Sequence, residues 1–137
     1  MPDCYYLAEV ESAPTFEQVV KNAGNMEVEF IAYPFKYGIA LEGSDQPWDL
    51  FNFNIGCMQE SKFNITGNRT IEIYNVGRDV CPVVSCTSSM TMKLNGYTAN
   101  FNSGESTDWR FKLKTGANTI TINGTGDVEF KFRKELL

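Results

Sequence analysis

Apolar and polar residues alternate along most of the chain, and the pattern is clearest between residues 113 and 133. Residues 119–123 and residues 127–133 place isoleucine, valine or phenylalanine at every second position, with threonine, asparagine and charged residues between them. Because successive side chains of a strand point to opposite faces, each run has one apolar and one polar face. The intervening residues 123–126 (NGTG) can adopt the positive φ angles of a tight turn. The pattern predicts a β-hairpin with one face in a core.

The same alternation recurs from residue 51 onward, interrupted by short turn sequences. It predicts strands at residues 51–57, 63–65, 71–75, 82–86, 90–94, 97–101 and 109–113. Residues 66–68 (TGN) and 95–96 (NG) are predicted turns, and Asn-Gly between alternating runs is the strongest short hairpin signal. The strands after Trp48 are joined mostly by short turns, with no convincing helix. This arrangement predicts an all-β fold, an antiparallel β-sandwich of jelly-roll or galectin-like type.

The first part of the chain is predicted to form a short β segment before this sandwich. Residues 5–10 are predicted to form a strand, with either set of alternate side chains turned inward. Residues 15–20 place apolar side chains at helical spacing after a threonine that could cap a helix, so one helical turn and a short strand are both open. Residues 26–33 alternate as a strand, and Pro34 is expected to end it because proline lacks the ladder N–H.

A boundary between two parts of the chain is predicted at residues 42–47 (EGSDQP), which have the composition of a loop. We therefore expect residues 1–40 to be an N-terminal segment separate from the main domain. Residues 48–137 are expected to form the β-sandwich domain.

The formal net charge is −5 and the sequence pI is about 4.7. Nucleic-acid binding depends on Lys and Arg contacts to phosphates, so this charge argues against a nucleic-acid partner. Binding to anionic membranes is disfavoured for the same reason, and no apolar run has the length of a membrane span. No signal-peptide pattern opens the sequence. We expect neither nucleic-acid binding nor membrane insertion.

Histidine is absent from the sequence, which removes the commonest general base and the commonest metal ligand. Paired carboxylates are the remaining enzymatic option for a β-sandwich. The available carboxylates are Glu72, Asp79, Glu105, Asp108, Asp127 and Glu129. Most of them lie on the polar side of a predicted strand or in a turn, where acidic residues serve solubility, so we do not expect an enzyme.

The four cysteines are Cys4, Cys57, Cys81 and Cys86, and none of them forms a CxxC pair that would indicate zinc. We expect them to be reduced and mostly buried. Residues 123–127 (NGTGD) offer oxygen ligands for calcium, but the segment lacks the carboxylate density that calcium prefers, and turn chemistry explains it better. We predict no catalytic, cofactor or metal site.

Exposed aromatic rings on a β-sandwich can stack against sugars, so a carbohydrate-binding module is an alternative. The candidate rings are Trp48, Trp109, Tyr74 and Tyr97. Trp109 alternates in register with Phe111 and Leu113, which assigns it to the core. Trp48 lies in the predicted loop at residues 46–49, where it is either exposed or plugs one end of the sandwich. Trp48 is therefore the candidate contact residue for a ligand or partner.

Two stretches of the sequence carry a family resemblance. The first comprises residues 5–10, 16–17 and 26–37, in which a strand runs into the sequence YPFKY. The second begins with IYNVG at residues 73–77 and continues through Pro82 and the Asn-Gly hairpin to Leu113, Gly116, Asn118, Ile120, Ile122 and Gly124. Together they cover most of the chain and resemble the distal tail protein (Dit) family of siphovirus-type phages and prophages.

The resemblance implies a structural protein of a phage or prophage tail tip or baseplate, located in the virion tail after synthesis in the bacterial host cytoplasm. In that family the N-terminal domain forms a hexameric ring at the end of the tail tube. The C-terminal galectin-like domain can contact other baseplate or receptor-binding proteins. The resemblance implies that residues 1–40 are the closing segment of the N-terminal domain and that residues 48–137 are the galectin-like domain. The implied partners are tape-measure, tail-tube and receptor-binding proteins and further copies of the chain. The alternative is a carbohydrate-binding module that recognises a glycan of the host cell wall.

Overall fold

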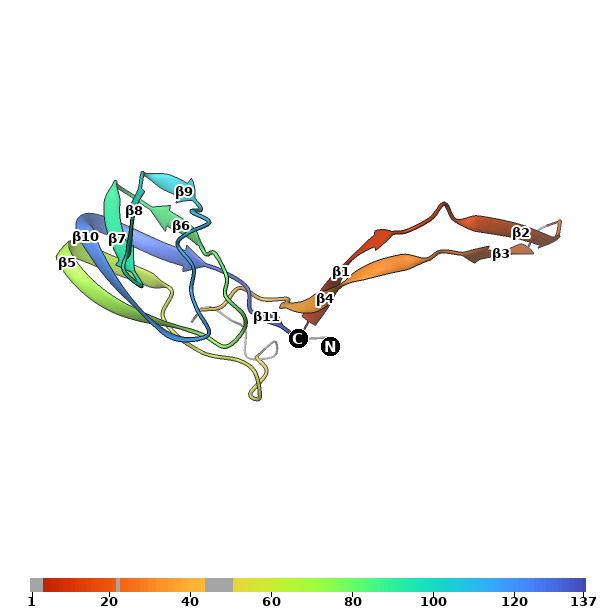
Figure 1. Ribbon diagram of the computed structural model, residues 1–137, viewed down its shortest axis with the longest axis horizontal. Helices are drawn as coiled ribbons and strands as arrows, with labels where there is room; N and C mark the ends of the chain where they lie inside the picture. Colours follow the sequence, from red (N-terminus) through yellow and green to blue (C-terminus); the bar gives the residue numbers. More distant parts are fainter. Residues whose placement is uncertain (1–3, 22, 44–50) are drawn as a thin grey trace.

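The computed structural model describes residues 4–21, 23–43 and 51–137, and every helix or strand element in these ranges is a β-strand. The predicted all-β fold with antiparallel pairing is confirmed. Figure 1 shows two parts, a curled sheet on the left and a long two-stranded projection on the right. We call residues 62–131 the body and residues 4–38 the arm.

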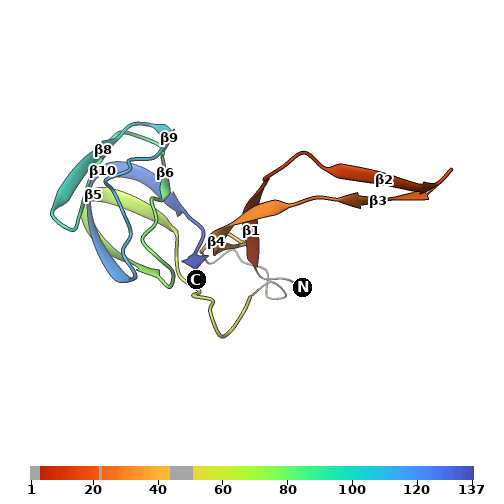
Figure 2. The same ribbon diagram turned by 45° about the vertical axis from the view of Figure 1, so that its right-hand side comes forward.

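The arm consists of two antiparallel strand pairs that follow each other along one ribbon (Figure 2). β1 (Cys4–Val10) pairs with β4 (Phe30–Gly38), and further out β2 (Thr15–Val20) pairs with β3 (Ala23–Glu27). Of the two alternatives for residues 15–20, the short strand is therefore the correct one. The ribbon extends away from the body, and no other described strand lies against its outer half.

The prediction that Pro34 ends the strand is wrong. Residues 26–33 do not form a single strand, because β3 ends at Glu27 and β4 continues through Pro34. The register of β1 against β4 shifts between Tyr6 and Ala8, which is the part of the ladder opposite this proline. A register shift interrupts the regular ladder hydrogen bonds, so the strand accommodates a residue without an N–H.

The body is built on two long strands, β5 (Lys62–Asn75) and β10 (Gly116–Lys131), which pair along nearly their whole length. The other edge of β10 pairs first with β7 (Met90–Leu94) and then with β6 (Val83–Cys86). One strand thus contacts both halves of the sheet. This arrangement makes β10 the central element of the body.

Two predicted turns prove to be one bend in the β5–β10 ribbon. Residues 66–68 and 123–126 lie inside continuous strands, and Gly67 stands opposite Gly124 in the ladder. The predicted closing hairpin is therefore wrong. Gly67, Gly124 and Gly126 have φ angles of 76°, 152° and 140°, which glycine adopts without the steric cost of a Cβ. The bend falls where β10 changes partner from β7 to β6, so the glycines curve the sheet instead of ending a strand.

The predicted Asn95-Gly96 hairpin is confirmed. It joins β7 to β8 (Tyr97–Phe101), with positive φ angles of 50° at Asn95 and 81° at Gly96, as a type I′ turn requires. β9 (Gly104–Ser106) pairs with β6 at the other end of the sheet. The six strands form one sheet that curls into a half-barrel, consistent with the predicted β-sandwich.

The alternating pattern correctly predicts which side chains of the body strands face inward. The fully buried apolar side chains from these strands are Ile65, Ile73, Val84, Met92, Ile120, Ile122, Val128 and Phe130. Residues 107–115 form only one isolated bridge, between Val80 and Leu113, but they add Phe111 and Leu113 to the same core. Because each such side chain contributes roughly 1.5–3 kcal/mol when buried, this core accounts for the stability of the body.

The predicted strand at residues 51–57 is wrong. The backbone N–H groups of Ile55 and Gly56 donate to the carbonyl oxygen of Asn52 at 3.3 and 2.6 Å. The side chain of Asn52 accepts a further hydrogen bond from the N–H of Asn54 at 2.9 Å. Asparagine side chains that bond to nearby backbone favour turns over a sheet ladder, which explains the difference.

The assignment of Trp109 to the core is also wrong. Residues 109–113 do not form a strand, and Trp109 is 71% exposed, although Phe111 is buried as predicted. The side chain of Asp108 accepts a hydrogen bond from the N–H of Arg110 at 2.9 Å, which forms a turn. This turn breaks the strand alternation and directs the indole outward.

The last strand, β11 (Glu135–Leu136), leaves the body and pairs with β4 of the arm. β1, β4 and β11 therefore form a three-stranded sheet at the base of the arm. By sequence, β11 belongs to the predicted domain 48–137, and it pairs with the predicted segment 1–40. The division into two domains stays a prediction, and the structure adds that the two segments share a sheet.

Candidate functional site

The arm presents large apolar side chains to solvent on both of its faces. Residues 5–7, with the sequence Tyr-Tyr-Leu, are all exposed, and successive side chains of a strand point to opposite faces. The other exposed apolar side chains of the arm are Val10, Phe16, Val19, Met26, Phe30, Ile31 and Tyr33. A two-stranded ribbon is at best marginally stable alone in water. Exposed apolar surface on this scale marks a site of contact with another molecule.

A groove of about 810 Å³ lies along β1 and β4 of the arm. Its apolar walls include Leu7, Val10, Ile31 and Tyr33. Glu9 and Glu11 also line it, and no lysine or arginine does so among the described residues. The groove therefore combines an apolar floor with negative charge, which suits a protein segment that carries apolar and basic side chains.

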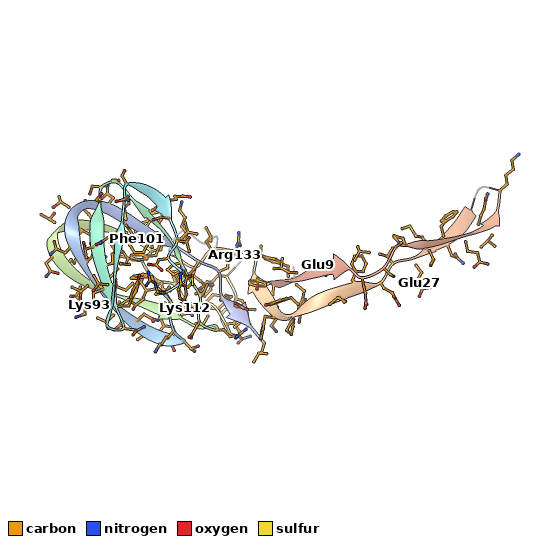
Figure 3. The ribbon with its side chains drawn as sticks, turned by 45° about the horizontal axis from the view of Figure 1, so that its top comes forward. Glu9, Glu27, Lys93, Phe101, Lys112 and Arg133 are labelled. Atoms are coloured by element: carbon orange, nitrogen blue, oxygen red, sulfur yellow. The ribbon has the colours of Figure 1, made fainter. Side chains whose placement is uncertain are left out.

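The arm as a whole is acidic. Residues 4–38 contain five glutamates and two lysines, a formal charge of −3. Glu9 and Glu27, labelled in Figure 3, lie on different strands along the ribbon. Like charges brought together are repulsive, so this distribution disfavours direct pairing of two arms.

The base of the arm is joined to the body by backbone hydrogen bonds. The N–H of Gly38 donates to the carbonyl oxygen of Lys134 at 2.9 Å, and the N–H of Glu42 donates to that of Phe132 at 2.9 Å. The N–H of Arg78 donates to the carbonyl oxygen of Glu135 at 2.8 Å. These bonds hold the chain on both sides of the junction, so the arm has a defined point of attachment.

A buried ion pair lies at this junction. Lys134 Nζ is 3.4 Å from Oε1 of Glu42, and both side chains are almost completely buried. Lys134 Nζ also donates to the carbonyl oxygen of Ile55 at 3.2 Å. Burial raises the pKa of Glu42, and the positive charge of Lys134 opposes that rise. Burial also raises the pKa of the Cys57 thiol, which favours the unreactive thiol over the thiolate.

The aromatic residues considered for sugar binding are only partly brought together. Trp48 lies outside the described residues. Tyr74 is exposed on β5. Tyr97 and Trp109 both lie beside Arg110, whose guanidinium carbon is 5.0 Å from the ring centroid of Tyr97 and 5.5 Å from that of Trp109. The structure therefore places two of the four candidates in one group.

Three of the six carboxylates considered for catalysis make separate local contacts. Glu105 forms an ion pair with Lys131, and Asp127 accepts a hydrogen bond from Nδ2 of Asn64 at 2.7 Å. Asp108 accepts a hydrogen bond from a tyrosine hydroxyl. Within the described part of the chain, no group of three or more His, Cys, Asp or Glu residues could hold a metal ion. These carboxylates stabilise local structure.

The cysteines and the segment considered for calcium are also placed by the fold. All four cysteines are free thiols, but Cys86 alone is buried, and Cys4, Cys57 and Cys81 are partly exposed. The expectation that most cysteines are buried is therefore wrong. Residues 123–127 lie in β10, so the turn chemistry proposed for them does not apply.

The arm surface is the functional feature that the sequence analysis missed. Its signal is present in residues 5–10 and 30–33, where apolar side chains occupy both alternating sets of positions. In a strand with one buried face, one of the two sets of alternate residues is apolar. Apolar residues in both sets indicate that both faces of the strand are covered, either by the chain itself or by another molecule.

Among residues 4–21, 23–43 and 51–137, no helix is long and apolar enough to cross a membrane. The comparisons with protein-family models, with curated proteins and with solved structures found no match to this chain.

Proposed function

We propose that this chain is a structural component of a phage or prophage tail tip or baseplate, where it acts by protein–protein contacts in tail assembly and host attachment. The observation that carries the proposal is the arm, a two-stranded ribbon with apolar side chains exposed on both faces. A ribbon of this kind becomes stable when another protein covers it. Its partners are other tail proteins, such as tape-measure, tail-tube or receptor-binding proteins, together with further copies of the chain.

The body supports the same proposal as a rigid mount for the arm. Its core is apolar, and the carboxylates of Glu105 and Asp127 make local contacts. β11 and the buried pair of Glu42 and Lys134 fix the arm to it. The resemblance of the sequence to the distal tail protein family supplies the biological setting.

The location can be tested on purified phage or prophage particles from a strain that encodes this chain. We expect mass spectrometry to detect the chain in the particles and gold-labelled antibodies to mark one end of the tail in electron micrographs. Finding the chain in the host extract and never in intact particles would rule the proposal out.

A matched pair of substitutions tests whether the arm makes the contacts. Tyr33 on the arm is 56% exposed and Tyr74 on the body is 47% exposed. Tyr33→Ser should lower incorporation into particles at least about tenfold, since tyrosine is a common hot-spot residue of protein interfaces. Tyr74→Ser serves as the control and should leave incorporation unchanged. Equal effects of the two substitutions would show that the arm is not the contact surface.

The alternative function, a carbohydrate-binding module, was predicted from Trp48, which lies outside the described residues. The observation that favours it is a different tryptophan, Trp109, which is exposed on the body. Sugar binding at this residue is compatible with a structural role for the arm, because the two surfaces belong to different parts of the chain.

A further inference from the structure

The turn around Trp109 holds the indole outward on a well-supported base. The N–H of Arg110 donates to Oδ1 of Asp108 at 2.9 Å, and the N–H of Phe111 donates to the carbonyl oxygen of Asp108 at 3.0 Å. Phe111 is buried, and its ring lies edge-on to that of Phe101 at 5.2 Å. Both sides of the turn are thus anchored in the body, while the indole is 71% exposed.

Polar groups are arranged beside this indole. The hydroxyl of Tyr97 donates to Oδ2 of Asp108 at 2.6 Å. The guanidinium of Arg110 lies over the rings of both Tyr97 and Trp109. The hydrogen bond from Tyr97 lowers the pKa of Asp108, so the carboxylate is ionised at neutral pH. The exposed indole therefore lies beside a guanidinium donor and a carboxylate acceptor that Tyr97 holds in place.

We infer that Trp109, Arg110 and Asp108 bind a pyranose unit of a glycan. The indole stacks against the C–H face of the sugar, because the negative face of an aromatic ring attracts the weakly positive C–H groups. The guanidinium donates to sugar hydroxyls and the carboxylate accepts from them, which orients the ring. This site belongs to the body, so its sugar contact does not depend on the proposed role of the arm.

The surroundings of Trp109 favour a sugar over a protein as its ligand. In residues 62–136, the other large apolar side chain that is exposed is Tyr74 on β5. Hot spots of protein interfaces lie within closely packed patches that exclude water. A single exposed ring between charged groups instead matches a site where one apolar contact and a few polar groups select a small ligand unit.

The first experiment screens the full chain on an array of pyranose oligosaccharides built from glucose, galactose, mannose and N-acetylhexosamines. The best-bound glycan is then titrated by tryptophan fluorescence. The sequence contains two tryptophans, so Trp48→Phe leaves Trp109 as the sole indole reporter. We expect a saturable change in its emission, with a Kd between about 10 µM and about 1 mM.

Substitutions at the turn then assign the site. Trp109→Ala should weaken glycan binding at least about tenfold, and Trp109→Phe should weaken it less because a smaller ring remains. Tyr74→Ala is the matched control and should bind as the unmodified chain does. Circular dichroism should confirm that each variant is folded, as expected for an exposed residue. Both Trp109 variants lack the reporting indole, so their binding is measured by isothermal titration calorimetry with the same glycan.

Three results would overturn the inference. The first is an array on which no glycan is bound. The second is glycan binding that Trp109→Ala leaves unchanged. The third is a contact with a tail protein that Trp109→Ala weakens while no glycan binds, which would make this residue part of a protein interface.

Discussion

The arm and the body are built from the same element, the antiparallel strand pair, yet only the body covers its own apolar side chains. In the body, β5 and β10 bend so that their inner faces share a core with β6, β7 and β8. In the arm, β2 and β3 pair only with each other among the described strands. A strand pair becomes a stable unit when its apolar face is covered, and residues 4–21, 23–43 and 51–137 give the outer arm no such cover.

The two parts also differ in the pattern of apolar residues along their strands. Body strands have one apolar set of alternate residues, which matches burial of one face within the chain. The arm has apolar residues in both sets, which matches burial by another molecule. Stability should therefore reside in the body and binding in the arm, a division that substitutions can test.

The largest expected effect on stability is the loss of a core ring from the body. Phe130 is fully buried on β10, whereas Phe30 is 63% exposed on the arm. Phe130→Ala should lower the free energy of unfolding by about 3–5 kcal/mol, because it removes buried surface and leaves a cavity. Phe30→Ala should change it by about 0.5 kcal/mol or less. Urea unfolding followed by circular dichroism measures both, and similar losses would refute the division between arm and body.

The next largest effect is expected at the bend of the β5–β10 ribbon. A Cβ at Gly124 would lie 2.8 Å from Cγ of Met90, while a Cβ at Gly67 would meet no atom within 4 Å. Gly124→Ala should therefore combine backbone strain with a steric clash and lower the free energy of unfolding by about 2–4 kcal/mol. Gly67→Ala introduces backbone strain alone and should lower it by about 1 kcal/mol. Thermal unfolding of the two variants gives the comparison. Equal losses of stability in the two variants would mean that the clash between the added methyl group and Met90 does not destabilise the chain.

The bend also shows where the sequence was informative and where it was not. Strand alternation identified the inward side chains of the body because one-sided burial leaves a local pattern. Asn95-Gly96 identified a hairpin because both positions of that turn require positive φ. The glycines at 67 and 124 have the same local signature, yet they lie opposite each other within one ribbon. That pairing joins positions far apart in the sequence, so local pattern alone could not reveal it.

The candidate surfaces were predictable to a smaller extent. Trp109 was assigned to the core by its spacing from Phe111, but a hydrogen bond from Arg110 to Asp108 forms a turn that reverses its direction. The base of the arm depends on pairing between β4 and β11, at opposite ends of the chain. Long-range pairing of this kind leaves no periodic pattern of residues, so this junction could not be predicted.

A pH-dependent effect is expected at the junction between the arm and the body. Burial raises the pKa of Glu42 above its ordinary value of 4.5. The carboxyl group of Glu42 therefore binds a proton more tightly in the folded chain than in the unfolded chain. Its contribution to stability is fully present below pH 4.5 and is lost as the pH rises through the raised pKa. Glu42→Gln removes this titration.

The stability of the unmodified chain relative to the Glu42→Gln variant should accordingly be highest in acid and fall as the pH rises, before it levels off. Urea unfolding of both proteins from about pH 4 to about pH 8 measures this difference. Asp108→Asn is a useful contrast, because the pKa of Asp108 is lowered in the folded chain. The contribution of Asp108 to stability therefore rises with pH, whereas that of Glu42 falls. A difference between the chain and Glu42→Gln that does not vary with pH would show that Glu42 titrates alike in the folded and unfolded states.

The smallest effect on stability is expected at the outer end of the arm, where Phe16 and Met26 face each other as cross-strand partners. Both side chains are exposed, so the double substitution Phe16→Ser and Met26→Ser should change the free energy of unfolding of the body by about 0.5 kcal/mol or less. The same variant should bind less of a dye that reports exposed apolar surface, and it should assemble less well with tail proteins. If the substitution instead destabilised the body as strongly as Phe130→Ala, the arm would belong to the same cooperative unit as the core, and its apolar surface would serve folding more than binding.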